Sequence, residues 1–184
     1  AGGARGVQAP GRAPRATQGQ VMATSDVATV TVVVRAEVGL AFQVFSEEID
    51  TWWRTGPRFR IGRRAVGRLT FEAGVGGRLF ETYETAAGTK THVSGNVTVW
   101  EPPRRLAFEW RGVNFRPDES TLVEVEFEPL GDNTRVTLRH SGWSRLPDDH
   151  PVRHGLAGAT FIREIGMWWA ALLSSLREHV GTRA

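Results

Sequence analysis

The sequence predicts a single α+β domain in which one curved antiparallel sheet packs against a long C-terminal helix. Three observations predict this class: a β-branched run followed by a helical pair, a series of strand patterns separated by short turns, and one extended amphipathic helix at the end. Helices therefore cluster at the ends of the chain instead of alternating with strands, which argues against a doubly wound sheet. A length of 184 residues without an internal repeat is typical of one domain.

The first structured run, VATVTVVVRA at residues 27–36, is β-branched and places Val30, Val32 and Val34 on one face, as in a strand. Residues 37–48 carry apolar side chains at helical spacing, and residues 49–53 predict a short second helix. This part of the sequence thus predicts one strand followed by two short helices.

Strand patterns then follow one another, punctuated by Gly, Pro and Asn. They lie near residues 58–61, 66–73, 77–84, 91–100, 104–111, 120–129 and 134–141. Short connections such as Ala86-Ala87-Gly88 predict an antiparallel meander. A broad apolar stripe predicts the closing helix, which begins near residue 151 or 155 and ends near residue 180.

Composition restricts the class of protein further. The formal charge is +3, but Arg5, Arg12 and Arg15 lie in residues 1–25, which contain no acidic residue, so the remaining chain is formally neutral. We interpret 1–25 as a disordered tail, with Met22 a candidate true start, and 26–182 as the domain. The balanced body argues against nucleic-acid binding. Absence of cysteine excludes thiolate sites, and with no apolar run of membrane-spanning length it favours a cytoplasmic protein.

Two segments of the sequence resemble a known family. They are GNVTVWEPPRRLAFEW at residues 95–110 and NTRVTLRHSGW at residues 133–143, supported by Trp52-Trp53 and Gly76-Gly77-Arg78. They resemble the SRPBCC superfamily, most closely the branch homologous to the activator of the heat-shock protein 90 ATPase. The resemblance covers about residues 27–180 and implies a START-like helix-grip fold with a cavity between sheet and helix. Since the superfamily includes lipid carriers, hormone receptors and polyketide cyclases, it does not specify a reaction.

Aromatic side chains are the main candidates for the cavity wall. Alternation along residues 104–111 places Leu106, Phe108 and Trp110 on one inward face. For any one aromatic residue, ordinary core packing is an equally good interpretation. The predicted ligand-binding residues are Trp52, Phe71, Tyr83, Phe108, Trp110, His140, Ile165 and Trp169.

His140 shares a strand face with Val136 and Leu138, so we expect it to point inward, near Trp110 or the long helix. Two interpretations stay open: a hydrogen-bonded core histidine, or a ligand contact that serves as general acid or base. No nucleophile elbow is visible, and Gly76-Gly77 is typical of a turn and not of a phosphate-binding loop.

His150 and His154 have a spacing that could place metal ligands on one helical turn. Pro151 weakens that interpretation, and Asp148 and Asp149 are better candidates for the N-cap and first turn of the closing helix. We therefore predict no metal and no cofactor.

An arginine run follows the helical pair without an acidic residue between Asp50 and Glu72. Its members are Arg54, Arg58, Arg60, Arg63, Arg64 and Arg68. Most such runs are solvated surface, but the family likeness puts this one beside the cavity mouth. Arg58 and Arg60 are therefore candidates to hold an anionic head group.

Three hypotheses about function follow. The first is a protein that binds a small apolar or amphipathic molecule, without membrane insertion and compatible with a homodimer. The second is a cyclase- or hydrolase-like enzyme that uses the same cavity. The third is a chaperone-associated interaction protein.

Overall fold

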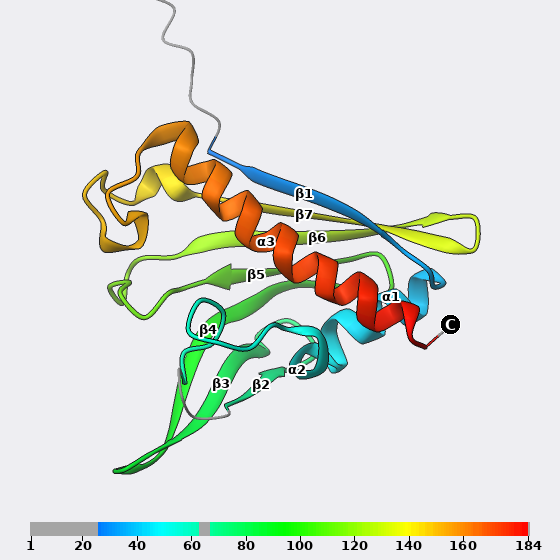
Figure 1. Ribbon diagram of the computed structural model, residues 1–184, viewed down its shortest axis with the longest axis horizontal. Helices are drawn as coiled ribbons and strands as arrows, with labels where there is room; N and C mark the ends of the chain where they lie inside the picture. Colours follow the sequence, from blue (N-terminus) through cyan, green and yellow to red (C-terminus); the bar gives the residue numbers. More distant parts are fainter. Residues whose placement is uncertain (1–25, 63–66, 184) are drawn as a thin grey trace, which may run out of the picture.

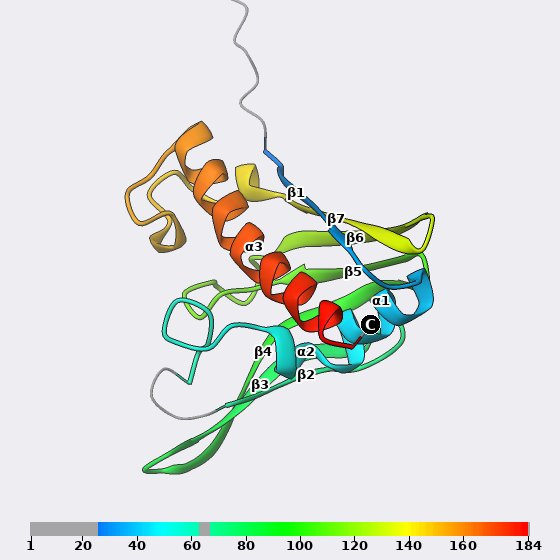
Figure 2. The ribbon, with the colours of Figure 1, turned by 45° about the vertical axis from the view of Figure 1, so that its right-hand side comes forward.

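The computed structural model describes residues 26–62 and 67–183. Within these residues, one curved antiparallel sheet of seven strands packs against helix α3, which crosses the sheet diagonally (Figure 1). Helices α1 and α2 lie near the C-terminal end of α3 (Figure 2). This architecture is the predicted helix-grip α+β fold. The predicted tail, Met22 and Arg63 and Arg64 lie outside the described residues.

Apart from a strand expected near residues 58–61, the elements follow the predicted order. The strands are β1 (Ala28–Val34), β2 (Arg68–Phe71), β3 (Arg78–Thr85), β4 (Gly88–Glu101), β5 (Arg105–Trp110), β6 (Thr121–Leu130) and β7 (Asn133–Ser141). The helices are α1 (Val38–Glu47), α2 (Ile49–Trp52) and α3 (Gly158–Gly181), with 3-10 turns η1 (Trp143–Arg145) and η2 (Pro151–Arg153). None of the described helices has both the length and the apolar character needed to cross a membrane.

The sheet is a meander from β2 to β7, and β1 completes it at the far edge beside β7. In the β1–β7 pair Val30 stands opposite Leu138 and Val32 opposite Val136. The chain between β1 and β2 must therefore pass from one edge of the sheet to the other, and α1 and α2 lie on that path (Figure 1).

Strand β6 shows why the sheet has one apolar face. Thr121, Val123, Val125 and Phe127 are buried, while the intervening side chains point outward. On that outer face Glu124 and Glu126 form ion pairs with arginines of β5 and β7. Because these pairs are partly exposed, they add little stability, and burial of the inner face supplies most of it.

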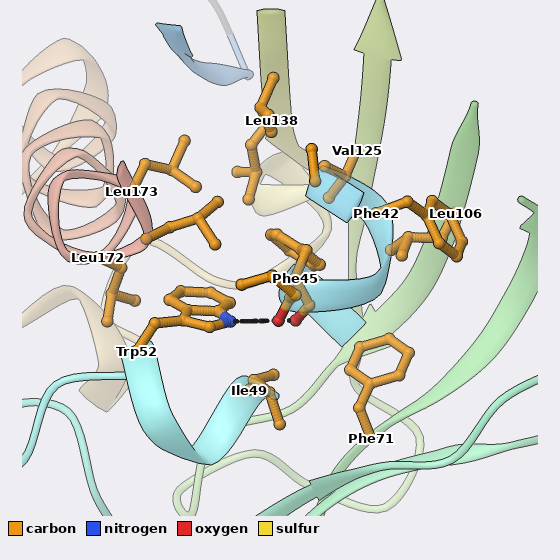
Figure 3. Close-up of a cluster of buried hydrophobic side chains, with 14 of the residues drawn as sticks. Phe42, Phe45, Ile49, Trp52, Phe71, Leu106, Val125, Leu138, Leu172 and Leu173 are labelled. Atoms are coloured by element: carbon orange, nitrogen blue, oxygen red, sulfur yellow. Dashed lines mark hydrogen bonds between the residues drawn. The ribbon is translucent and has the colours of Figure 1, made fainter. Parts of the chain in front are cut away.

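The main core lies where α1, α2 and α3 meet the inner face of the sheet (Figure 3). Phe45 packs against Trp52 and Phe127, and Leu172 and Leu173 reach the same cluster from α3. The Trp52 indole N–H donates to the carbonyl of Val44 at 3.0 Å. The polar end of this buried indole thus has a partner in the protein.

Two sequence predictions about elements were wrong. Residues 58–61 form a turn and the start of a loop and not a strand, since Phe59 and Arg60 donate their N–H groups to the carbonyl of Gly56. The second error concerns the start of the closing helix, which begins at Gly158.

Asp148 and Asp149 do not cap that helix, because its N-cap is Ala157. Pro151 instead opens the separate 3-10 turn η2, and the His150 side chain caps that turn by accepting the N–H of Val152. The prediction that Asp148 and Asp149 cap the closing helix was therefore wrong, and the residue that caps a helical turn in this region is His150, at the start of η2.

Candidate ligand-binding pocket

A pocket of about 410 Å³ opens between the loop after α2, the inner face of β3 to β5, and α3. Its lining is mostly apolar and aromatic and comes from six segments: the loop after α2, β2, β3, β4, the end of β5 with the residues after it, and α3. The lining residues are Trp53, Pro57, Arg58, Phe59, Arg60, Ile61, Leu69, Leu79, Glu81, Ser94, Trp110, Arg111, Gly112, Val113 and Trp168. A volume of this size accommodates a small molecule of several fused rings.

Three tryptophans and one phenylalanine form the aromatic wall. Trp53 stacks on Trp110 with ring centroids 6.2 Å apart, and Trp168 meets both rings edge-on at 5.7 and 5.6 Å. Phe59 stacks on Trp168 at 5.9 Å. Such a wall suits a flat aromatic ligand, because further rings can stack or meet these edges with the same geometry.

The indole N–H groups of this wall hold the loop that forms the pocket rim. Trp53 Nε1 donates to the carbonyl of Phe59 at 3.0 Å, and Trp168 Nε1 donates to the carbonyl of Arg58 at 3.0 Å. The polar ends of two tryptophans are thus satisfied within the protein, which leaves their ring surfaces as the apolar contribution to the pocket.

The two predicted head-group arginines differ sharply in environment. The Arg60 guanidinium is buried and bonds to the Asp50 carboxylate and to the carbonyls of Arg54, Asp50 and Trp53. It therefore fastens the loop to α2. The Arg58 side chain is 61% exposed, and its nearest carboxylate, Glu164, is 3.9 Å away. Of the two, Arg58 has donors free for a ligand at the rim.

Sequence reasoning missed two polar residues of the pocket wall, Glu81 and Ser94. Both are buried, at 2% and 4% exposure. The Glu81 carboxylate accepts the backbone N–H groups of Ile61 and Gly62 at 2.8 and 3.1 Å, so it also holds the loop. A signal for Glu81 did exist: its position two residues from Leu79 places it on the inward face of β3.

His140 is buried behind the pocket, as its strand position predicts. Its Nδ1 accepts the Trp169 indole N–H at 2.9 Å, so in the neutral ring Nε2 carries the proton and donates to Thr121 Oγ1 at 2.8 Å. The Thr121 hydroxyl in turn donates to the carbonyl of Trp110. Burial lowers the pKa of His140 from 6.5 to about 3. With both nitrogens occupied, this geometry matches the core-histidine interpretation.

Only some of the residues predicted to bind a ligand or its head group line the pocket. Trp110, Arg58 and Arg60 line it, and Trp169 lies directly behind, 6.1 Å from Trp110 between ring centroids. The other predicted residues lie elsewhere: Trp52, Phe71 and Phe108 are in the core, Ile165 packs between the two apolar clusters, and Tyr83 is on β3 toward the hairpin turn.

His150 and His154 do not come together as metal ligands. His150 Nε2 lies 3.0 Å from Glu119 Oε2, and its Nδ1 accepts the N–H of Val152. His154 adopts a left-handed backbone conformation at the end of η2, which turns it away from helical spacing. Among the residues that the structure describes, no group of three His, Asp or Glu side chains could hold a metal ion.

Comparisons with known proteins agree with this fold. Residues 35–165 match the family model described as activator of Hsp90 ATPase homolog 1-like protein. An anthrahydroquino-γ-pyrone synthase is 30% identical, with a TM-score of 0.51, over 83% of this chain and 97% of that protein. A comparison with curated proteins found no significant match.

Two more distant structures show the likeness of fold alone. A protein from Cytophaga hutchinsonii has a TM-score of 0.61 at 12% identity, over 88% of this chain and 98% of its own. The Aha1 dimer from Colwellia psychrerythraea has a TM-score of 0.55 at 16% identity, over 84% of this chain and 95% of its own. The family match spans more than half of the present sequence, so the chain belongs to the activator of Hsp90 ATPase homolog 1-like family of the SRPBCC superfamily.

Proposed function

We propose that this protein binds a small, flat aromatic molecule in the pocket between α3 and the sheet. The observation that carries the proposal is the wall of Trp53, Phe59, Trp110 and Trp168 around a pocket of about 410 Å³. Apolar lining with a few polar groups is the usual composition of a small-molecule site.

The similar synthase supports an aromatic ligand. Its name describes a product of fused aromatic and pyrone rings, and at 30% identity over most of both chains the likeness goes beyond fold. A fused-ring molecule also matches the rings of the pocket wall in shape, since stacked and edge-on contacts need flat partners.

Affinity should depend on both an apolar and a polar part of the site. Burying about 300 Å² of apolar ligand surface at ~25 cal/mol per Å² gives a gross gain of ~7 kcal/mol. Association and ordering costs offset part of this gain, so apolar contact alone gives binding of roughly micromolar strength or weaker. Arg58 at the rim supplies a candidate polar contact for an anionic substituent.

Calorimetric titration with anthraquinone-2-carboxylate and its methyl ester tests the proposal. We expect both to bind saturably to the wild type, and Trp110→Ala to weaken both by roughly tenfold through lost contact area. Arg58→Ala should weaken only the carboxylate, by roughly threefold. Arg135→Ala, which removes an exposed arginine of the outer sheet face, is the control and should change neither affinity. Absence of saturable binding of both probes would refute the proposal.

A cyclase activity in the same pocket is a second candidate, favoured by the synthase likeness. A suitable test substrate is an ortho-hydroxyaryl 1,3-diketone. In its closure the phenol oxygen bonds to the distal carbonyl carbon, one molecule of water leaves, and a γ-pyrone forms. Acceleration of this closure above the rate in buffer, measured by absorbance, would favour the enzyme over a passive binder.

The chaperone-associated function remains a third proposal, supported by the description of the family. Stimulation of an Hsp90 ATPase by the purified protein tests it directly. If the purified protein, at the concentrations used in the ligand titrations, does not stimulate the ATPase, small-molecule binding is the better account.

A further inference from the structure

A β-bulge at Ser94 turns its side chain into the pocket. In the β3–β4 pair, Leu79 stands opposite Gly95 and Phe80 opposite Val93, so Ser94 is the extra residue on β4. Bulges of this kind redirect a side chain that regular alternation would place elsewhere. Here Val93 is partly exposed on the outer face, while Ser94 is buried and lines the pocket.

Close approach of β4 and β5 fixes this bulge in place. A Cβ atom at Gly95 would lie 1.7 Å from the carbonyl oxygen of Glu109, so only glycine allows the two backbones to come so near. The N–H of Arg111 also donates to the carbonyl of Ser94 at 2.6 Å. The backbone that carries Ser94 is therefore held closely against the end of β5.

At this end of the pocket, the described residues do not use all of the hydrogen-bonding capacity of the polar side chains. The Ser94 hydroxyl makes no hydrogen bond to any residue that the structure describes, although the residue is 4% exposed. The Glu81 carboxylate uses two of its roughly four acceptor positions on Ile61 and Gly62. Opposite Glu81 in the register stands His92, whose buried Nε2 also has no described partner.

We propose that Ser94 and Glu81 together bind a ring hydroxyl of the aromatic ligand, an inference that rests on the proposed function of the pocket. The ligand hydroxyl donates to the Glu81 carboxylate and accepts the Ser94 hydroxyl proton. This pairing gives the Ser94 hydroxyl, which faces the pocket and bonds to no residue that the structure describes, a partner in the bound state. The site therefore selects hydroxylated aromatic molecules over their unsubstituted or methylated counterparts.

Binding of 2-naphthol, neutral at pH 7, and of 2-methoxynaphthalene tests the selection by calorimetry. We expect the wild type to prefer 2-naphthol by about tenfold, since its hydroxyl donates to a charged acceptor. Ser94→Ala should weaken 2-naphthol binding about fivefold and leave the ether unchanged. Because the Ser94 hydroxyl has no hydrogen bond to a described residue to lose, the free variant should melt at or above the wild-type temperature. Glu81→Gln should reduce the preference further.

Ser46→Ala is the matched control, since Ser46 is a buried serine outside the pocket that bonds to the Phe42 carbonyl. It should leave both affinities unchanged. Equal binding of the two naphthalenes, no binding of 2-naphthol, or an unchanged 2-naphthol affinity in Ser94→Ala overturns the inference. If either anthraquinone probe still binds saturably in that case, the proposed function stands without this inference; if neither probe binds, both fail.

Discussion

Single residues show how burial decides between similar candidates. Arg58 and Arg60 are two positions apart, yet one guanidinium is exposed at the rim and the other is buried with four hydrogen bonds to the protein. Arg60→Ala should therefore reduce stability, whereas Arg58→Ala should affect only ligands with a negative charge. Composition and spacing cannot predict which of these two arginines is buried, because that depends on the partners of Arg60, which lie on α2 and in the loop that follows it.

His140 gives a prediction for pH at this scale. Its folded pKa of about 3 lies below the value of 6.5 expected when unfolded, so between these values the unfolded chain binds one proton more. Stability is therefore lost as pH falls below 6.5, at up to about 1.4 kcal/mol per pH unit from this group. Urea unfolding of the wild type and His140→Gln at pH 7 and pH 5 measures the difference.

The wild type should lose about 2 kcal/mol more than the variant over that interval, because glutamine does not titrate. Equal losses in the two proteins would mean that the His140 ring is reached by water or by an acidic partner when protonated.

At the scale of elements, two glycines differ in whether a neighbouring backbone leaves room for a side chain. Gly166 lies within α3, where an added Cβ atom would meet nothing within 4 Å, so it marks no close backbone approach. The close approach occurs instead at Gly95, on the bulged part of β4.

Gly95→Ala should lower the free energy of unfolding by several kcal/mol, because the new methyl group collides with the Glu109 backbone, which cannot move freely within the sheet. Gly166→Ala is the control and should raise stability by about 1 kcal/mol, the usual gain of alanine over glycine inside a helix. Chemical denaturation of both variants measures this contrast; a mild effect at Gly95 would show that β4 and β5 can separate there without loss.

At the scale of the whole molecule, α3 covers the inner face of the sheet. Leu172, Leu173 and Leu176 are almost fully buried in the main core, and the helix also contributes Trp168 to the pocket. Stability and ligand binding therefore depend on the same helix, which contacts the sheet along one stripe and solvent along the other.

Leu176→Asp should unfold the domain, since it places an unpaired charge in that core. Met167→Asp, on the exposed side of the same helix, should cost no more than about 1 kcal/mol. Circular dichroism during thermal melting distinguishes the two. A Leu176→Asp protein that melts like the wild type would contradict the packing of α3 on the sheet.

The sequence by itself determined the elements whose patterns are local. The alternation in β6, the inward direction of His140, the helical pair and the apolar stripe of α3 all follow from periods of 2 and 3.6 residues, and these predictions agree with the structure. The family likeness then predicted how the elements are arranged, and the fold is the expected one.

The tertiary structure alone decided which residues form the pocket. Phe108 and Trp110 share one face of β5, but Phe108 is in the core and Trp110 lines the pocket. Which of them is covered depends on where α3 and the loop after α2 cross the sheet. Ser94 reaches the pocket through a bulge that no local period encodes. Both outcomes depend on contacts between segments far apart in sequence, and periodicity carries no information about such contacts.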